Sequence, residues 1–236
     1  MQLQSNGGKT MLDSLSTPKS LVNQAYERIL DALSDGTFKS GERLTQEDIA
    51  TRLNVSRQPV THALAVLKAQ GFLVSSGKRG LSVAEVDSAL LDAIYQVRTA
   101  IEPLAVRLAT NRMTKNAIRR GQALIEQGHK SAIAKDRMAA LQADMDFHSF
   151  IYELSGNPII EETMRLHWQH LRRGMAEVHS HSGMLLAVWR EHSLILERII
   201  AGDGDAAAAC VHDHLVGAYA RRINLYADPG NVVGAP

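Results

Sequence analysis

The sequence predicts a mainly α-helical protein, with three helices and a β-hairpin followed by an all-α antiparallel bundle of six or seven helices. Two observations predict this fold class. Apolar residues recur three and four positions apart along most of the chain, as on the buried face of a helix. Short apolar runs around a glycine-bearing turn occur near residues 72–83 and predict the hairpin. Because the composition changes at Asp87 and only helical periodicity follows, we expect two domains.

The composition is typical of a soluble globular protein, with 45% hydrophobic and 22% charged residues among 236. A chain of this length can bury two modest cores. Its single cysteine, Cys210, cannot form an internal disulfide, which favours a reducing compartment. The first twenty residues lack the apolar core of a secretion signal, and no run approaches the roughly 18 apolar residues of a membrane span. We therefore expect a cytoplasmic protein without a membrane partner.

Both ends of the chain differ in composition from the part between them. The N-terminal stretch is polar, contains Gly7-Gly8 and is scattered with Ser and Thr, which predicts a flexible arm. The last residues are expected to fray. The predicted division is an arm over 1–17, a small domain over 18–86, a helical domain over 87–226 and a flexible tail over 227–236.

The small domain opens with two helices whose ends are marked by polar residues. The first is expected to begin near Ser20 and to end at Asp35. Thr45 is a good N-cap for the second helix, and Asp48 three residues later nearly completes a capping box. Asn54 then ends this helix, in the left-handed conformation that asparagine tolerates.

A third helix and the hairpin complete the small domain. Ser56 is expected to cap the helix, Pro59 lies in its first turn, where a missing amide hydrogen costs little, and Gly71 ends it. The hairpin arms are 72–74 and 81–83. In the second domain we expect helices near 88–112, 115–130, 134–154, 158–178, 184–201 and 204–225.

The small domain carries a local surplus of positive charge. No acidic residue occurs between Ile49 and Ala84, although the formal net charge of the whole chain is only +1. The five basic residues of this stretch are Arg52, Arg57, Lys68, Lys78 and Arg79. Such a surplus suggests a polyanionic partner. Two helices joined by a tight turn and followed by a basic hairpin are the outline of a winged helix-turn-helix domain, which binds double-stranded DNA. The alternative is a solvated basic face on a protein-interaction module.

In helix-turn-helix domains the second helix of the motif enters the major groove, and its first turns face the base edges. Arg57 can read guanine and Gln58 can pair with adenine. The small basic hairpin tip can reach a phosphate or enter the minor groove. The predicted DNA-contacting residues are Thr45, Ser56, Arg57, Gln58, Thr61, His62, Gly77, Lys78 and Arg79.

The helical domain contains one pair of residues with the spacing of metal ligands. Asp144 and His148 stand four apart and project from one helical face, where a carboxylate and an imidazole can share a cation. For this pair alone, an exposed ion pair is the favoured interpretation. Spacing does not sort the other histidines of the domain, which include His167, His170, His179, His181, His212 and His214. The residues by themselves indicate only a histidine-rich helical domain that could bind a metal.

The small domain resembles the winged helix-turn-helix of the GntR family of bacterial transcription regulators. The resemblance rests on Leu44, Glu47, Ile49-Ala50, Leu53, Val55-Ser56-Arg57, Pro59-Val60, Ala63-Leu64, Leu67, Gly71-Phe72-Leu73 and Gly80. The family string after the capping serine is Arg-Thr-Pro-Val-Arg-Glu-Ala-Leu, and here Thr61 and His62 replace its second arginine and its glutamate. The implied fold is unaffected because these positions are exposed, but the operator consensus of the family does not transfer.

Residues 88–222 resemble the FCD ligand-sensing domain, the helical bundle of the FadR-type branch of that family. The matching strings are Arg98-x-x-Ile101-Glu102, Asp144-x-x-Phe147-His148, Ser155-Gly156-Asn157, Glu191-His192, Gly202-Asp203 followed by Ala206, and His214-Leu215. By comparison with metal-containing members, the resemblance implies that one divalent ion is held by Asp144, His148, His192 and His214. Zinc is the expected ion, by availability and affinity for imidazole, with nickel and manganese as alternatives.

The resemblance implies a sensor. Three imidazoles and one carboxylate leave coordination positions that a small organic carboxylate could fill, with Arg98 facing that carboxylate through its planar fork. The alternative for Arg98 is a helical pair with Glu102. We therefore expect a homodimeric transcription repressor, not an enzyme, whose winged domains bind a palindromic operator. Two alternatives are a regulator that senses the metal ion itself and a metal-dependent enzyme. The fused DNA-binding module and the absence of an evident further base both argue against the enzyme.

Overall fold

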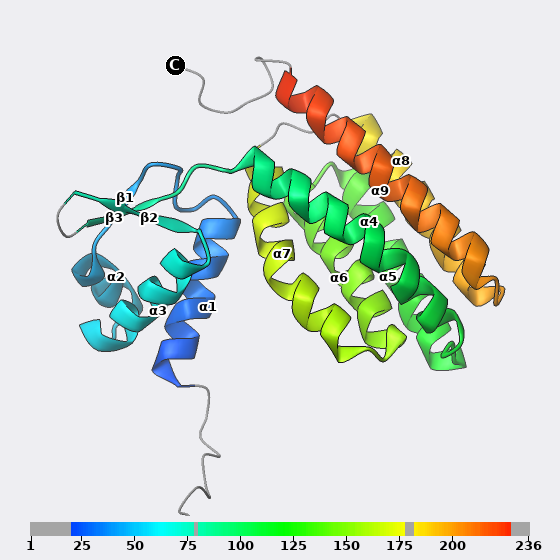
Figure 1. The fold of residues 1–236 in the computed structure, drawn as a ribbon, viewed down its shortest axis with the longest axis horizontal. Coiled ribbons are helices and arrows are strands. Elements are labelled where there is room, and N and C mark those ends of the chain that lie inside the picture. Colours follow the sequence, from blue (N-terminus) through cyan, green and yellow to red (C-terminus); the bar gives the residue numbers. More distant parts are fainter. Residues whose placement is uncertain (1–19, 78–79, 178–181, 228–236) are drawn as a thin grey trace, which may run out of the picture.

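The computed structural model describes residues 20–77, 80–177 and 182–227. It consists of a small winged domain and a larger bundle of helices that lie side by side (Figure 1). The predicted fold class, a winged helix-turn-helix followed by an all-α bundle, is confirmed. The predicted arm over 1–17, the hairpin-tip residues Lys78 and Arg79 and the tail from residue 228 onward lie outside the described residues.

The winged domain contains three helices and a three-stranded antiparallel sheet in which β3 lies between β1 and β2. Its elements are α1 (Leu21–Ser34), β1 (Arg43–Leu44), α2 (Gln46–Leu53), α3 (Arg57–Ala69), β2 (Leu73–Ser76) and β3 (Gly80–Val83). The sequence predicted the hairpin of β2 and β3 but missed β1, because a run of two residues shows no alternation. Leu44 is 3% exposed and pairs with Leu81 of β3, so burial adds this short strand to the sheet.

Several predicted helix ends lie where the sequence places them. The Ser20 hydroxyl accepts a hydrogen bond from the first turn of α1, and the Thr45 hydroxyl accepts one from the Asp48 amide at 3.2 Å. Asn54 adopts a left-handed φ of 52° after α2. The prediction for Ser56 was half right. It stands at the N-cap position of α3, but within the described residues its side chain makes no capping hydrogen bond.

The bundle contains six helices in the described part of the chain. They are α4 (Ser88–Thr110), α5 (Lys115–Ala134), α6 (Arg137–Ser155), α7 (Pro158–Glu177), α8 (Ser182–Ile200) and α9 (Gly204–Ala227). The break between the second and third helices was predicted a few residues too early. Lys135 makes this break with a left-handed φ of 58°, and Asp136 caps α6. Lysine is a good helix former, so composition contained no stop signal there. None of the helices in the described ranges combines the length and apolarity of a membrane crossing.

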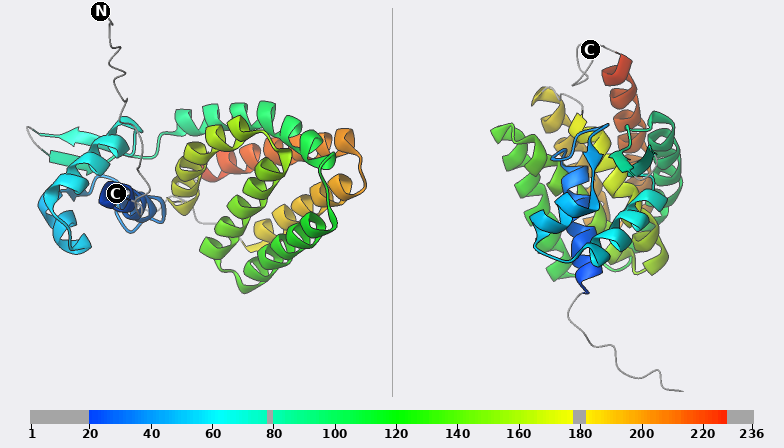
Figure 2. Two further views of the ribbon diagram at one scale, coloured as in Figure 1. Left: turned by 90° about the horizontal axis from the view of Figure 1, so that it is seen from below. Right: turned by 90° about the vertical axis from the view of Figure 1, so that its left-hand side faces the viewer.

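Each domain has its own hydrophobic core. The core of the winged domain is formed by α1, α2, α3 and the sheet, and Leu33, Val60 and Phe72 are 0% exposed in it. The core of the bundle includes Trp168 and Trp189. Within the bundle α4 packs along α9, and α5 packs against α6 and α8. The side of the bundle that faces the winged domain is formed by α7 (Figures 1 and 2).

Polar contacts from α7 join the two domains. The Ser34 hydroxyl of α1 donates to Gln169 Oε1 at 3.1 Å. Arg172 Nη1 lies 3.1 Å from Asp31 Oδ1, also in α1. Arg173 donates to a main-chain carbonyl of the segment that joins β3 to α4. Since only this short segment connects the domains covalently, α7 provides the second, noncovalent connection.

Candidate metal centre and nucleic-acid interface

Four side chains predicted as metal ligands meet inside the helical bundle. Asp144 and His148 lie one turn apart on α6, His192 comes from α8 and His214 from α9. Each offers one ligand atom, and these atoms all lie within 4.8 Å of one another. Two nitrogen or oxygen ligands of a tetrahedral zinc ion are about 3.4 Å apart. Small shifts of the side chains would therefore bring the four ligand atoms to coordination distances from one ion.

The Nε2 atom of His192 has two other members of the cluster as near neighbours. It lies 3.3 Å from His148 Nε2 and 3.2 Å from Asp144 Oδ1. His148 and His192 are 0% exposed and His214 is 4% exposed, whereas the Asp144 side chain is 14% exposed. The carboxylate is thus the most accessible member of a buried cluster.

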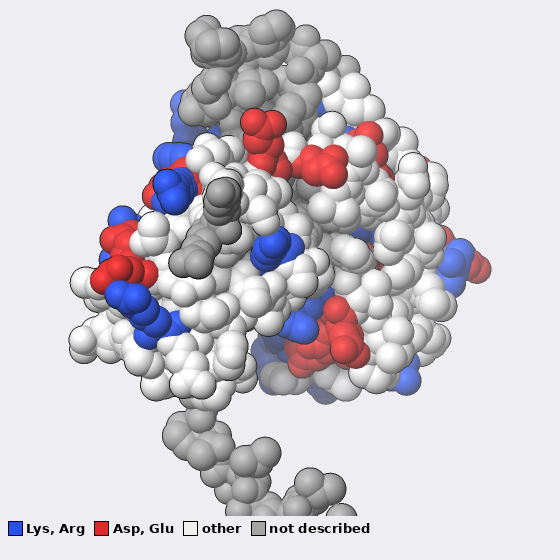
Figure 3. Space-filling model, turned by 60° about the vertical axis from the view of Figure 1, so that its left-hand side comes forward, with Lys and Arg blue, Asp and Glu red and all other residues white. Residues whose placement is uncertain are grey.

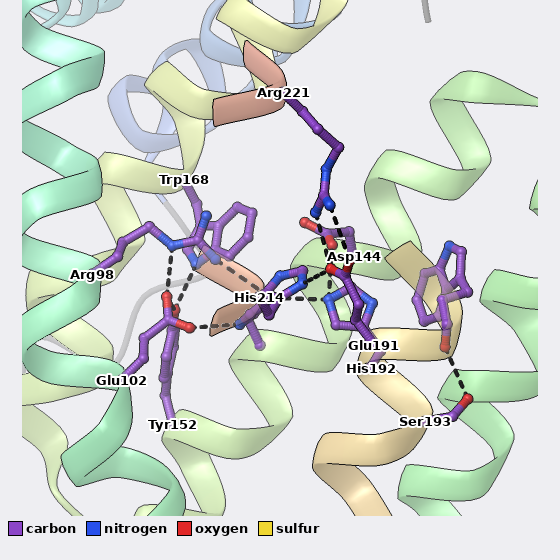
Figure 4. A network of polar contacts seen from close by, with 12 residues as sticks. Arg98, Glu102, Asp144, Tyr152, Trp168, Glu191, His192, Ser193, His214 and Arg221 are labelled. Carbon is purple, nitrogen blue, oxygen red and sulfur yellow. Dashed lines mark hydrogen bonds and ion pairs between the residues drawn. The ribbon is translucent and has the colours of Figure 1, made fainter. Parts of the chain in front are cut away.

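Two glutamates outside the cluster contact its imidazoles (Figure 4). Glu102 Oε2 lies 2.8 Å from His148 Nδ1, and Glu191 Oε2 lies 2.8 Å from His214 Nδ1. A carboxylate on Nδ1 orients the ring and keeps the lone pair of Nε2 for an ion. Sequence reasoning missed this function of the two glutamates. No spacing rule finds it, because Glu191 stands beside His192 in the chain but contacts His214 of the next helix.

Burial favours the neutral form of two imidazoles of the cluster, His192 and His214. Removal from water lowers the pKa of His192 well below its usual range and also lowers the pKa of His214, because a charged imidazole is poorly solvated in the interior. Burial alone would raise the pKa of the Glu102 carboxyl, but Arg98 and His148 beside it hold that pKa well below its usual range. Neutral imidazoles and ionised carboxylates are the states in which these groups bind metal ions.

Arg98 of α4 connects the cluster with a cavity beside it. Its Nε donates to Glu102 Oε1 at 2.6 Å, and its Nη2 lies 3.3 Å from His148 Nε2. The guanidinium carbon lies 4.4 Å from the ring centroid of Trp168. Arg98 is 1% exposed and also lines the cavity. The helical pair with Glu102 is therefore formed, and the same side chain lines the cavity, while its binding of an effector stays a prediction.

The cavity has a volume of about 140 Å³ and is bordered by Asp144 and His214 of the cluster. Its wall comes from α4, α6, α7, α8 and α9 and consists mostly of apolar side chains. The basic residues of the wall are Arg98, Arg137, Arg221 and Arg222. Of these, the sequence indicated only Arg98. The other three are brought to the cavity by the packing of helices, which no local pattern reports.

The residues present fit a divalent metal ion. The cluster supplies three nitrogen donors and one oxygen donor, and both atom types bind zinc at about 2.0–2.2 Å. Imidazole also suits nickel, and carboxylate suits manganese. The contacts of Glu102 and Glu191 with two of the rings are those expected around metal-binding histidines.

The other histidines that the structure describes in the helical domain do not belong to this cluster. His170 of α7 faces the winged domain, where it contacts Phe72. His212 is exposed on α9 and lies 3.4 Å from Asp213. His179 and His181 lie outside the described residues.

The predicted DNA-contacting residues around the start of α3 lie at the surface of the winged domain. Ser56, Arg57, Gln58 and His62 are exposed, and Thr61 is half-buried. The Thr61 hydroxyl donates to the main-chain carbonyl of Arg57 at 2.9 Å, so it already has an acceptor inside the helix. Arg57, Gln58 and His62 are therefore the side chains of this helix most available to a nucleic acid.

Two acidic residues of α2 partly offset the positive surplus. Glu47 Oε1 lies 2.6 Å from Arg57 Nη2, and Asp48 Oδ2 lies 3.1 Å from Arg52 Nε. Both acids precede the acid-free stretch of the sequence, so the surplus is smaller on the folded surface than in the linear count. The four side chains are at least 50% exposed. Exposed pairs of this kind are weak, and a phosphate can replace the acid.

The remaining predicted contacts lie at the start of α2 and at the hairpin tip. Thr45 is exposed while it caps α2, and Gly77 turns the chain with a φ of 64°. Lys78 and Arg79 lie outside the described residues, so their DNA contacts stay predictions. Figure 3 shows that Lys and Arg side chains on this side of the molecule are interspersed with Asp and Glu.

Comparison with known proteins bears on both domains. The family of bacterial regulatory proteins called the gntR family matches residues 21–83, and the FCD domain matches residues 93–217. The chain is 32% identical over 166 residues to the Nta operon transcriptional regulator of Aminobacter aminovorans, which covers 65% of this chain and 78% of that protein. It is 28% identical over 196 residues to the HTH-type transcriptional regulator McbR of Escherichia coli (strain K12), which covers 81% of this chain and 88% of that protein.

Solved structures show the same arrangement of domains. The structure of McbR/YncC from E. coli has a TM-score of 0.79 at 25% sequence identity, covering 89% of this chain and 100% of that chain. A putative GntR transcriptional regulator from Rhodococcus sp. RHA1 has a TM-score of 0.74 at 24% identity, covering 87% of this chain and 98% of the other, which shows similarity of fold.

Proposed function

Because this chain belongs to the gntR family of bacterial regulatory proteins and carries an FCD domain, we propose that it is a repressor controlled by a small organic carboxylate. Like the relatives that match it, it is a DNA-binding transcriptional regulator and not an enzyme. In this proposal the winged domain, residues 18–86, binds the operator. The helical domain, residues 87–226, binds the effector and forms the homodimer.

The observation that supports effector binding most directly is the cavity next to the four-residue cluster. Asp144 and His214 belong to both the cluster and the cavity wall. A divalent ion, expected to be zinc, would be held by Asp144, His148, His192 and His214 and would supply a Lewis-acid site for a carboxylate oxygen. The cavity provides space for the rest of the effector.

Arg98 would bind the effector carboxylate from the protein side. Its guanidinium lines the cavity and lies within contact distance of His148. Glu102 orients the guanidinium through Nε, while Nη2 lies 3.3 Å from His148 Nε2, and the effector carboxylate would bind at the terminal nitrogens. A planar fork suits a carboxylate because two parallel hydrogen bonds can form.

The effect of effector binding would be transmitted to the DNA-binding domain by α7. Leu171 and Met175 of this helix line the cavity, while Gln169 and Arg172 contact α1. A shift of α7 that accommodates the effector would therefore change the contacts that orient the winged domain. Coupling of about 1–3 kcal/mol changes DNA affinity roughly 5- to 150-fold, which suffices for a switch.

The symmetry of the operator would follow from the two-fold symmetry of a homodimer. Two winged domains related by a two-fold axis bind two half-sites, which makes the operator palindromic. This mode of action places the protein in the cytoplasm, where the DNA is.

A direct metal sensor is the second candidate function, because the same four ligands would serve it. The two functions differ in what changes DNA affinity. Operator binding would be measured by fluorescence anisotropy for the metal-free protein, the zinc-loaded protein, and the zinc-loaded protein with each of a panel of small carboxylates. We expect the carboxylate arm to weaken operator binding at constant zinc. If zinc alone changes the affinity and no carboxylate does, the metal-sensor function is the correct one.

A further inference from the structure

The cavity beside the metal cluster is the size of a small ring. Its volume is about 140 Å³, and an apolar protein cavity of about 150 Å³ accommodates benzene. The space therefore suits a body of about six carbon atoms in addition to a group that reaches the cluster. An effector with only two or three carbons would leave much of it unfilled.

Most of the wall cannot bind polar groups. Hydrocarbon side chains reach it from five helices, and they include Leu91, Leu141, Leu171, Leu185, Val188 and Ala218. A hydroxyl placed against such a wall would lose its hydrogen bonds to water without replacement. Polar hydroxy acids are thus disfavoured, although their carboxylate could still reach the cluster.

The apolar residues of the wall form a band along the helices, with the cluster on one side and Arg137, Arg221 and Arg222 on the other. On α6, Leu141 lies about one turn from Asp144, and on α9 Ala218 lies one turn from His214. Four residues of helix span about 6 Å. An apolar band one ring in width therefore begins one turn from the two members of the cluster that border the cavity.

The charged residues of the wall are the four arginines described above and, within the described part of the chain, one carboxylate, Asp144. Three of the arginines also pair with carboxylates outside the wall: Arg98 with Glu102, Arg221 with Glu191 and Arg222 with Asp92. Arg98 stands at the cluster end of the wall, since its guanidinium contacts His148. A ligand with a negative group at this end and an uncharged apolar body matches both the charge and the lining.

We propose that the effector is a monocarboxylate with a ring-sized apolar body, such as an aromatic acid, rather than a small hydroxy acid. This inference rests on the proposed sensing of a carboxylate at the metal cluster. The carboxylate faces the cluster and Arg98, and the body fills the band lined by Leu141, Val188 and Ala218.

Three carboxylates test the size and polarity of the body. Sodium benzoate, acetate and L-lactate are titrated into the zinc-loaded full-length chain by isothermal titration calorimetry. Benzoate should bind on the order of a thousandfold more tightly than acetate, because it buries about five more methylene-sized groups and each strengthens binding by roughly fourfold. L-Lactate should bind no more tightly than acetate. Binding of acetate and lactate without tighter binding of benzoate would refute the apolar body and leave carboxylate sensing intact. Absence of binding by all three would refute both.

A cavity-filling variant tests the location. Val188→Phe occupies the band and should weaken benzoate binding about tenfold or more, while zinc content and acetate binding stay unchanged. Val216→Phe is the matched control, because Val216 is 48% exposed on α9 and does not line the cavity. Benzoate binding that survives Val188→Phe at full strength would show that the ring lies elsewhere.

Discussion

The imidazole of His170 lies flat on the phenyl ring of Phe72, with ring centroids 4.1 Å apart and an angle of 5° between the ring planes. His170 belongs to α7 of the bundle, and Phe72 directly precedes β2 of the winged domain. The stack therefore joins the helical bundle to the winged domain. Desolvation by burial lowers the pKa of His170 to about 4, against a smaller opposing effect of a hydrogen bond to the Gln70 main chain.

Acidification should loosen the two domains. The pKa of His170 is about 4 in the docked state, below the roughly 6.5 of a free histidine, so proton uptake favours separation. The contribution of the stack is complete above about pH 6.5 and declines as the pH falls toward about 4. Small-angle X-ray scattering at pH 7.5, 5.5 and 4.5 measures the separation as an increase in maximum dimension.

The variant His170→Phe separates this effect from other titrations. Phenylalanine keeps a flat ring against Phe72 but has no proton to bind, so its domains should stay docked over the same pH range. Loss of a bound ion at low pH would affect both proteins equally. An identical expansion of the variant and the parent would assign the change to groups other than His170.

The fold was predictable because its signals are local. Helical periodicity predicts the six helices of the bundle. Polar N-cap residues such as Thr45 predict where helices of the winged domain begin. The strand β1 was not predictable, since two residues show no alternation and its place depends on pairing with β3. The break at Lys135 was predicted a few residues too early, because lysine is not a helix-stop signal.

The grouping of Asp144, His148, His192 and His214 was only partly predictable from the residues. Asp144 and His148 share one turn of α6, so spacing finds them. His192 stands 44 residues after His148, and only a family resemblance connected the two. Glu191 contacts a histidine of another helix. Such contacts arise when α8 and α9 pack, and a linear pattern contains no record of that packing.

Arg57→Ala should weaken specific operator binding by about 1–3 kcal/mol and relax the preference at one base position, because a bidentate contact to a base is lost. Stability should change little, since the Arg57 side chain is 63% exposed and its pair with Glu47 lies in solvent. Anisotropy with the operator and with single-base variants measures both effects. Arg119→Ala removes the same charge from an exposed site on α5 and should leave binding unchanged. Equal losses for the two variants would point to net charge rather than to base reading.

His192→Ala should lower the zinc content of the purified protein to well below one ion per chain. His192 Nε2 lies within 3.3 Å of ligand atoms of both His148 and Asp144. Its loss therefore removes the ligand atom that lies next to two other ligand atoms of the cluster. Metal analysis by mass spectrometry measures the content, and circular dichroism checks that the helices persist. His212→Ala is the control, because this exposed histidine of α9 lies outside the cluster. Unchanged zinc in His192→Ala would remove this residue from the ligand set.

Glu191→Gln should weaken zinc binding by about 10- to 100-fold while leaving all four ligands in place. The amide matches the carboxylate in shape but not in charge, so it weakens the contact with His214 Nδ1, which is 2.8 Å long. Competition with a zinc-binding dye measures the affinity. Glu197→Gln, on the exposed face of the same helix, should retain the parental value. A parental affinity in Glu191→Gln would show that this carboxylate serves Arg221 alone, which it also contacts at 2.9 Å.

Arg98→Lys should abolish the response to effector without changing operator affinity in its absence. Lysine keeps a positive charge beside the buried Glu102, so it avoids the cost of leaving that carboxylate unpaired. It lacks the planar fork, however, and cannot form two parallel hydrogen bonds with a carboxylate. Operator binding with and without benzoate measures the response, and a thermal melt checks that the bundle remains folded. A normal response in a folded variant would confine Arg98 to its ion pair with Glu102 and assign effector recognition to the metal cluster and the remaining arginines of the cavity.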